Sequence, residues 1–331
     1  MNEPAARAPG AVAGTAASAA PALLRSWLFV PGDSERKQEK ALATEADAVI
    51  LDLEDSVSPD RLAAARERVS RLLGARQRTP GPQLWVRVNA PASGEMRADL
   101  DAVFAGGAPY GVVLPKVCAA AEIAEAARYL DMLETQVGSA SWSTRLLVIA
   151  TETARGLLAL PGYPAALGNT RAIMARLAGL TWGVEDLGAD LGALARHDAA
   201  GELTFTFQLA RSSCLLAAAA LGVQAIDGVH TDLRDAHGLQ HELASARRDG
   251  FSGKLAIHPD QIAPINAAFT PTAAEREHAE RVVAAFAAAP GAGVVSLDGR
   301  MIDRPHLLQA QRLLAAAHGN LSGAQRAKGP T

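Results

Sequence analysis

The chain has few cysteines, few aromatic residues and no long basic or apolar run. Its two cysteines, Cys118 and Cys214, are not in a CxxC pair, and two thiols among 331 residues do not make a disulfide framework. We therefore expect a reducing cytoplasm. The net charge of −3 and the lack of a basic run argue against a general nucleic-acid binder. Because no apolar run reaches the roughly 18 residues of a membrane span, a membrane partner is not expected either.

The N-terminal segment, residues 1–24, is rich in Ala, Pro and Gly and lacks the continuous Leu, Ile and Val core of a secretory signal peptide. We expect a disordered leader there. An organellar presequence is the alternative, because the segment carries Arg7 and Ser18. Apolar residues make up 49% of the chain, which is enough for one large core. A single α/β barrel of about 250 residues with appendages fits this length as well as two smaller domains do.

Short β-branched or apolar runs alternate with amphipathic segments rich in Ala, Leu and Arg. Strands that alternate with helices pair in parallel through βαβ crossovers, and eight of them predict a closed TIM (β/α)8 barrel. A doubly wound open sheet is the alternative, but no GxGxxG follows the first strand. The eight runs begin at Trp27, Ala48, Leu84, Gly111, Leu146, Leu180, Ala225 and Lys254.

Nearly every predicted strand ends in polar residues. In a barrel these carboxyl ends gather at one rim, where loops from different strands face one central space. A purely structural strand end needs only turn-forming residues, so the concentration of acids favours a metal or acid/base site. The polar ends are Pro31-Gly32-Asp33, Asp52 to Asp55, Arg87 and Asn89, Lys116, Glu152, Glu185-Asp186, Asp227, and His258-Pro259-Asp260.

Two acids at neighbouring strand ends suit a divalent cation. Glu152 follows the fifth predicted strand and Asp186 follows the sixth. Mg²⁺ typically takes one or two protein carboxylates and completes an octahedron with waters and substrate oxygens. The alternative is structural, because each acid also lies at the start of a predicted helix and can cap its N–H groups.

Basic side chains near the same rim suggest an anionic substrate. Arg87 ends the third strand, where a guanidinium can bind a carboxylate through two parallel N–H bonds and stabilise oxyanion charge. An ion pair with Glu54 is its structural alternative. Arg36 and Lys40 share one face of the helix that follows the first strand and can hold phosphates together. The glutamates interleaved with them make an ordinary solvated face an equally good explanation.

Three further polar residues have both a structural and a functional explanation. Glu54 and Asp55 either hydrogen-bond the waters of a metal or orient Arg87, and structural ion pairs are the alternative. His258 precedes a proline at a strand end, which favours a turn over a catalytic base.

Asp303 begins the last helical segment of the chain. It precedes Arg304-Pro305 and an Ala/Leu run with helical spacing. Its carboxylate can accept a hydrogen bond from a free N–H of the first turn, so it is a natural N-cap. The local pattern leaves open whether Asp303 only caps the helix or reaches an active site.

Nine segments occur in a fixed order between about Arg25 and about Ala317. They are "RSWLFVPGDSERKQEKA", "DAVILDLEDSVSPDRLAAAR", "LWVRVNA", "GVVLPKV", "VIATETARGLL", "WGVEDLGADLG", "GVQAIDGVHTDLRDAHGL", "GFSGKLAIHPDQI" and "GRMIDRPHLLQAQRLL". In this order they resemble the citrate lyase β-subunit-like family, which includes citryl-CoA, malyl-CoA and citramalyl-CoA lyases. The joint occurrence of the segments is specific for the family, whereas any one of them alone is a weak signal.

The resemblance implies a TIM barrel, a homotrimer or a multiple of it, that cleaves or forms a carbon–carbon bond next to a CoA thioester with the help of Mg²⁺. Matched by motif, Glu152 and Asp186 correspond to the metal ligands, and Arg87 to the substrate-binding arginine, which the implied reaction also makes catalytic. Relatives often carry Lys at the position of Arg36, and a planar guanidinium binds phosphate differently from an ammonium. The implied substrate-binding residues are Phe29, Arg36, Lys40, Arg87 and Glu152.

The resemblance also implies that the helix beyond the barrel is a lid whose aspartate, here Asp303, reaches the active site of a neighbouring subunit. In the implied reaction the substrate carboxylate and hydroxyl bind the Mg²⁺ held by Glu152 and Asp186. The bond to the α-carbon breaks, and Arg87 stabilises the oxyanion charge. Asp303 protonates the resulting acyl-CoA enolate. An acid at neutral pH needs a raised pKa, which closure of the lid over a dry site would supply.

The sequence thus predicts a disordered leader at 1–24, a barrel at 25–270, a C-terminal helical extension and lid at 271–318, and a flexible tail at 319–331. The expected function is Mg²⁺-dependent cleavage of a 3-hydroxy-3-carboxy acyl-CoA, such as citramalyl-CoA or malyl-CoA, into a 2-keto acid and acetyl-CoA or a related acyl-CoA. One alternative is a citryl lyase β subunit that acts on a carrier-protein thioester within a larger complex. Others are thioester hydrolysis and a noncatalytic acyl-CoA-binding or scaffold subunit.

Overall fold

The structure, a computed structural model, describes residues 23–76 and 80–327. The predicted leader therefore lies outside the described residues except for Leu23 and Leu24, and so do the last four residues of the predicted tail. In the described part, no helix has the length and apolar character needed to cross a membrane.

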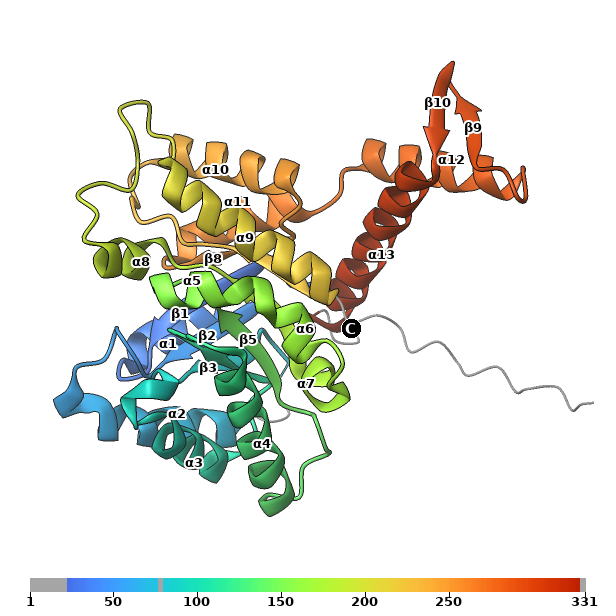
Figure 1. Cartoon of the computed structure of the whole chain (residues 1–331). Helices are drawn as coiled ribbons and strands as arrows, with labels where there is room; N and C mark the ends of the chain where they lie inside the picture. The colour runs from blue at the N-terminus through green and yellow to red at the C-terminus, as the bar shows by residue number, and fades with distance from the viewer. Residues whose placement is uncertain (1–22, 77–79, 328–331) are drawn as a thin grey trace, which may run out of the picture.

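Eight parallel strands close into a barrel in sequence order, which confirms the predicted TIM (β/α)8 fold (Figure 1). Each strand is short and mostly buried, as expected for strands that helices cover on the outside. The strands are β1 (Ser26–Pro31), β2 (Ala48–Asp52), β3 (Gln83–Arg87), β4 (Gly111–Leu114), β5 (Arg145–Ile149), β6 (Leu177–Thr181), β7 (Gln224–Asp227) and β8 (Gly253–Ala256).

Helices surround the barrel. Several end at a glycine in the left-handed conformation, for example Gly222 after α9, because a residue without a side chain tolerates that backbone. The helices of this layer are α1 (Glu35–Leu42), α2 (Leu62–Arg76), α3 (Met96–Gly106), α4 (Ala120–Gln136), α5 (Ala154–Ala159), α6 (Tyr163–Leu167), α7 (Arg171–Arg176), α8 (Val184–Leu191), α9 (Phe205–Leu221), α10 (Ala236–Asp249) and α11 (Ile262–Phe269).

The alternation of side chains along each strand divides the core into two layers. Residues such as Val49 and Leu51 face the helices, whereas Trp27, Ile50 and Trp85 fill the barrel interior. The rings of Trp27 and Trp85 pack edge to face, with centroids 4.8 Å apart. The large Trp85 ring requires a glycine on the neighbouring strand. A Cβ on Gly111 would lie 2.3 Å from that ring.

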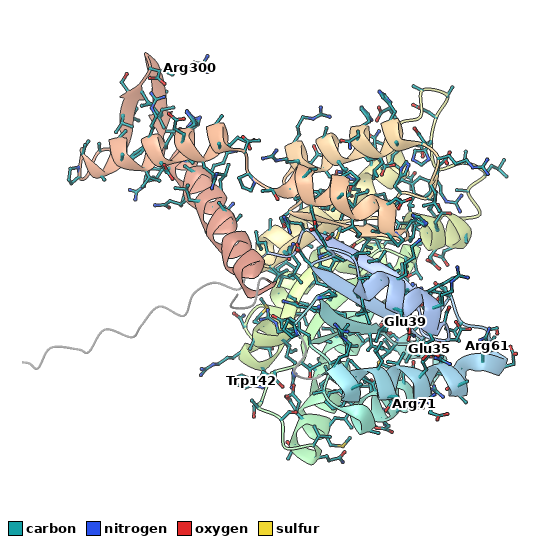
Figure 2. All side chains as sticks on the ribbon, turned by 180° about the vertical axis from the view of Figure 1, so that it is seen from behind. Glu35, Glu39, Arg61, Arg71, Trp142 and Arg300 are labelled. Carbon is teal, nitrogen blue, oxygen red and sulfur yellow. The ribbon has the colours of Figure 1, made fainter. Side chains whose placement is uncertain are left out.

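Beyond the barrel, the chain forms an arm made of α12 (Ala273–Ala287), β9 (Val294–Leu297), β10 (Arg300–Asp303) and α13 (Arg304–Ala327). Its own small apolar cluster includes Val282 and Ile302. Figure 1 shows α12 and the two-stranded sheet standing away from the barrel, and Figure 2 shows Arg300 at the tip of that sheet. The backbone of α13 is helical to Ala327, past residue 318 where the sequence analysis ended the helical extension.

Candidate active site

The strand period places a polar layer directly above the aromatic interior of the barrel. Two residues after the inward-facing Trp27, Ile50 and Trp85 come Phe29, Asp52 and Arg87, and residues two apart on a strand point the same way. The parallel register of β2 and β3 sets Asp52 beside Arg87.

Arg87 is bound by a carboxylate and an aromatic ring. Its Nε and Nη2 each donate to one oxygen of Asp52 at 2.7 Å, and its Cζ lies 4.8 Å from the centroid of the Phe29 ring. Burial alone would raise the pKa of Asp52, but the guanidinium outweighs it and holds that pKa below its usual value. The remaining nitrogen, Nη1, faces Glu54 Oε2 at 3.1 Å and Asp55 Oδ2 at 3.4 Å. The sequence-predicted pairing with Glu54 is therefore present, but Asp52 is the main partner of Arg87.

Glu152 does not cap a helix. The cap of α5 is Thr153, whose Oγ1 accepts the N–H of Gly156 at 3.0 Å. Only 3% of Glu152 is exposed, and its carboxylate accepts a hydrogen bond from the backbone N–H of Lys116. A Cβ on Gly183 would lie 2.6 Å from Glu152 Cγ, so the loop after β6 can approach this side chain only with glycine at that position.

Asp186 lies within the first turn of α8, and the cap position of that helix is Gly183. Its Oδ1 lies 3.2 Å from Lys116 Nζ. Burial and, after it, the charge of Asp186 raise the pKa of Glu152 to about 8. The two predicted metal ligands are therefore electrostatically coupled at the same rim.

The donors at this rim fit a hard divalent cation. Carboxylate oxygens are the ligands that Mg²⁺ prefers. Glu54 Oε2 is buried, and apart from its ion pair with Arg87 it has no hydrogen-bond partner among the described residues. In the part of the chain that the structure describes, no group of three or more His, Cys, Asp or Glu side chains is arranged to hold a metal ion. A cation here would thus take Glu152 and Asp186 as protein ligands and complete its shell with water and substrate oxygens.

The raised pKa of Glu152 predicts how stability depends on pH in metal-free protein. A carboxyl group with a folded-state pKa of about 8 keeps a proton that the unfolded chain, with a pKa near 4.5, releases. The free energy of unfolding should therefore fall as pH rises from about 4.5 to 8. Burial raises the pKa of Glu54 to about 7, so this group adds to the fall in the free energy of unfolding. Thermal unfolding with EDTA at pH 5 and pH 8 measures this effect, which Glu152→Gln should reduce and saturating Mg²⁺ should largely remove. Stability that rises through this window would contradict it.

Two predicted CoA-binding residues lie on the outer surface. Arg36 and Lys40 are both exposed on α1. Beside them, Glu35 pairs with Arg68 on α2 at 2.8 Å, and Figure 2 shows Glu35 and Glu39 on this side of the barrel. Nothing in the fold joins Arg36 and Lys40 to the Arg87 cluster within the described residues, so their contact with substrate stays a prediction.

Asp303 lies on the arm at the junction of β10 and α13. Its carboxylate contacts Nδ1 of His306 at 2.5 Å, and this hydrogen bond lowers the pKa of Asp303. Within a single chain the carboxyl group is therefore ionised at neutral pH. A role as proton donor requires a different environment from the exposed arm.

Two other strand-end residues have structural partners. Asp227 faces outward from the barrel, where it accepts hydrogen bonds from Trp182 Nε1 at 2.7 Å and Arg211 Nε at 2.9 Å. His258 Nδ1 accepts the N–H of Asp260 at 3.3 Å, which supports the turn expected there.

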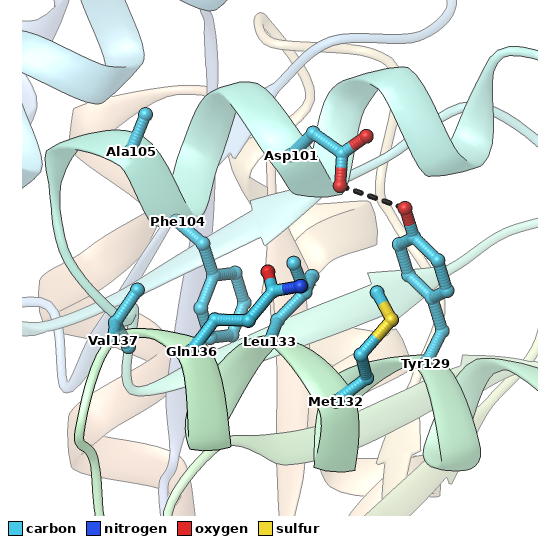
Figure 3. A pocket seen from close by; sticks show the side chains of 8 residues that line it. All are labelled: Asp101, Phe104, Ala105, Tyr129, Met132, Leu133, Gln136 and Val137. Carbon is cyan, nitrogen blue, oxygen red and sulfur yellow. Dashed lines mark hydrogen bonds between the residues drawn. The ribbon is translucent and has the colours of Figure 1, made fainter.

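Two hollows of the helix layer lie outside this cluster. One, of about 450 Å³, lies between α3 and α4, where Tyr129 donates to Asp101 at 2.7 Å (Figure 3). The other, of about 530 Å³, lies between α9 and α10 over Asp227 and Lys254. Neither is lined by Glu152, Arg87 or Lys116, so the candidate site is the rim cluster and not a hollow of the helix layer.

Two residues of the cluster were not among the predicted site residues. Asp52 and Lys116 both appeared among the polar strand ends, but nothing distinguished them there from turn formers. The usable signal for Asp52 is its position two residues after an inward-facing apolar residue, next to Arg87 in register. For Lys116, the sequence carries no sign of its left-handed backbone, at φ 50°.

Comparison with known proteins identifies the family. The model of the HpcH/HpaI aldolase/citrate lyase family matches residues 25–259, and a model described as a C–C bond lyase of the TIM-barrel fold matches residues 207–319. A (3S)-malyl-CoA thioesterase of Cereibacter sphaeroides is 37% identical, over 88% of this chain and 94% of that protein. The mitochondrial citramalyl-CoA lyase of Rattus norvegicus is 33% identical, over 88% of this chain and 86% of that protein.

Solved structures agree with this assignment. CitE from Mycobacterium tuberculosis, in complex with magnesium, acetoacetate and coenzyme A, aligns with a TM-score of 0.69 and 34% identity, over 89% of this chain and 98% of that one. A second structure from the same organism, a citrate lyase β subunit with oxaloacetate and magnesium, is 36% identical over 74% of this chain and 96% of that one, with a TM-score of 0.59. The chain is therefore a member of the HpcH/HpaI aldolase/citrate lyase family.

Proposed function

We propose that this protein is a Mg²⁺-dependent carbon–carbon lyase that cleaves a 3-hydroxy-3-carboxy acyl-CoA into a 2-keto acid and acetyl-CoA or a related acyl-CoA. The observation that carries the proposal is the rim cluster, in which the two coupled carboxylates Glu152 and Asp186 lie with the buried guanidinium of Arg87. Relatives that bear the names citramalyl-CoA lyase and citrate lyase β subunit support the reaction class.

Glu152 and Asp186 would hold the cation, which when bound supplies Lewis-acid polarisation of substrate oxygens. Arg87 is 9% exposed, so its charge acts on a developing oxyanion with little screening by water. Asp52 and Phe29 fix the plane of its guanidinium before substrate arrives, which removes the cost of reorganisation during the reaction. Phe29 also closes one side of the site with an apolar ring.

The proton donor would come from a second copy of the chain. Asp303 is the last residue of β10, and Figure 1 shows β9 and β10 standing away from the barrel. Exposed residues of the arm include Met301 at 73% and Leu308 at 55%. Packing of these side chains against a neighbouring barrel would bury Asp303 and raise its pKa by desolvation. We therefore propose a homotrimer, or a multiple of it, in which each arm completes the site of its neighbour. Arg36 and Lys40 would contact the phosphates of the CoA portion.

Thioester hydrolysis is the second candidate, because (3S)-malyl-CoA thioesterases are among the similar proteins. Hydrolysis needs a water molecule at the thioester carbonyl, whereas carbon–carbon cleavage needs a proton donor at the α-carbon. The products separate the candidates: a 2-keto acid with an acyl-CoA indicates lyase activity, and free CoA with an intact hydroxy acid indicates hydrolysis. Assays of citramalyl-CoA, malyl-CoA and citryl-CoA with Mg²⁺ test both, and activity only on a carrier-protein thioester would favour a citryl lyase subunit. No Mg²⁺-dependent cleavage of any of them would favour a noncatalytic subunit.

Substitution of the proposed ligands tests the metal site directly. Glu152→Gln and Asp186→Asn should each weaken Mg²⁺ binding by at least about tenfold, because a neutral amide is a far poorer ligand for a hard dication than a carboxylate. Isothermal titration with MgCl2 measures the affinity without substrate. The matched control is Asp190→Asn, since Asp190 lies on the same helix α8 but bonds the backbone N–H of Ala154. Unchanged affinity in both ligand variants would refute the assignment.

A further inference from the structure

Lys116 is the residue that touches both proposed metal ligands. Its backbone N–H donates to Glu152, and its ammonium lies 3.2 Å from Asp186 Oδ1. It follows β4, so it reaches the rim from a different strand than either ligand. The backbone is in the left-handed region at φ 50°, which is uncommon for a residue with a side chain and marks a position that its surroundings hold in place.

The ammonium of Lys116 is surrounded by acids. Nζ lies 2.7 Å from Glu54 Oε1 and 2.9 Å from Asp55 Oδ2, in addition to its contact with Asp186. Glu54 and Asp55 accept hydrogen bonds from this ammonium, whereas Asp186 forms only an ion-pair contact with it. The contact with Asp186 is the longest of the three.

Acidic groups outnumber basic groups in this cluster. Five carboxyl groups face two basic side chains, and these seven residues are Asp52, Glu54, Asp55, Glu152, Asp186, Arg87 and Lys116. Arg87 is committed to Asp52 by two short hydrogen bonds. Lys116 is therefore the positive charge that stabilises the remaining acids.

We propose that Lys116 is a positioning residue whose ammonium competes with Mg²⁺ for Asp186 and so sets the metal affinity of the site. The inference rests on the proposed metal site at Glu152 and Asp186. Without metal, the ammonium holds Asp186 toward Glu152. A cation bound by Asp186 would stand close to Nζ, and two like charges at that separation repel. Metal binding would therefore withdraw Nζ from Asp186, while Glu54 and Asp55 would keep the lysine at the rim.

Removal of the ammonium tests the competition. Lys116→Met should lower the Kd for Mg²⁺ by at least about tenfold, because it removes a competing charge and leaves Glu54 and Asp55 to attract the dication. The thermal shift that Mg²⁺ produces should grow correspondingly, since tighter binding stabilises the folded state more at a given metal concentration. Titration calorimetry and thermal unfolding of the full chain with MgCl2, both without substrate, give the two readings.

Three further variants separate the explanations. Lys116→Arg keeps the charge and should stay within about threefold of the wild-type Kd, whereas Lys116→Gln, a second neutral variant, should behave like Lys116→Met. Lys37→Met removes an exposed lysine of α1 and controls for a general change in net charge. An unchanged or higher Kd in the neutral variants overturns the inference.

Failure of the metal site itself gives a different pattern. If Glu152→Gln and Asp186→Asn both bind Mg²⁺ as tightly as the wild type does, the proposed site is refuted and the inference with it. Affinity that depends on Glu152 and Asp186 but not on Lys116 refutes the inference alone.

Discussion

Asp303→Asn should lower kcat for carbon–carbon cleavage by at least about 100-fold, because a positioned acid contributes roughly that much or more to a proton transfer. Mg²⁺ affinity and oligomer size should stay unchanged, since Asp303 lies on the arm and not among the rim carboxylates. Steady-state kinetics with formation of the keto acid as readout, together with titration calorimetry and sedimentation, measure the three quantities. The proposed enolate would still form in this variant but would lack its proton donor.

A matched control lies in the same arm. Asp298 occupies the turn between β9 and β10, where its carboxylate pairs with Arg281. Asp298→Asn makes the same chemical change on the same element, and kcat should stay within about twofold, since exposed ion pairs contribute little. An equal loss in both variants would show that the arm needs its charges for folding and not Asp303 for chemistry.

Mixed oligomers test which barrel Asp303 serves. A subunit with Asp303→Asn keeps an intact rim, and a subunit with Glu152→Gln keeps an intact arm. If each arm completes a neighbouring site, co-refolded mixtures of the two inactive variants should regain a substantial share of wild-type activity. No gain over the separate variants would place Asp303 with its own barrel or outside the reaction.

The barrel and its rim were predictable because both depend on local periodicity. The alternation of eight strands with helices predicts a closed barrel. The two-residue period of the third strand predicts that the Arg87 side chain points into the central space. For Glu152 the sequence leaves a metal ligand and a helix cap as alternatives, and the structure excludes the cap because Thr153 caps α5. The polar ends of the strands also included Asp227, which faces outward, because the inward position of β7 is taken by Ile226.

The remainder of the site depends on long-range contacts. The partnership of Lys116 with Glu54 and Asp186 joins three separate strand ends, and its left-handed backbone has no pattern in the sequence. The proposed role of Asp303 depends on how two chains meet. The lowered pKa of its carboxyl group within one chain shows why. The hydrogen bond from His306 favours the charged form, and only burial by another surface would reverse that preference.

Arg87→Lys should lower kcat/KM by at least about 100-fold, comparable to the loss of one oxyanion donor. A lysine has no planar fork, so it cannot keep two parallel bonds to Asp52 while facing the Phe29 ring and a substrate oxygen. The buried Asp52, only 1% exposed, would also lose one of its two short hydrogen bonds. Steady-state kinetics across substrate concentrations measures the effect, and a lower kcat at an unchanged Mg²⁺ affinity would locate it in the transition state.

Arg61→Lys provides the matched control for this substitution. Arg61 pairs with Asp33 at 3.1 Å, but 58% of its side chain is exposed, so the same change should leave kcat/KM within about twofold. The comparison isolates what burial adds to an arginine–carboxylate pair. In water an ammonium replaces a guanidinium at little cost, whereas at the rim the bidentate geometry fixes where the positive charge stands. Wild-type kcat/KM in Arg87→Lys would show that the charge alone suffices and that Asp52 and Phe29 do not preorganise the site.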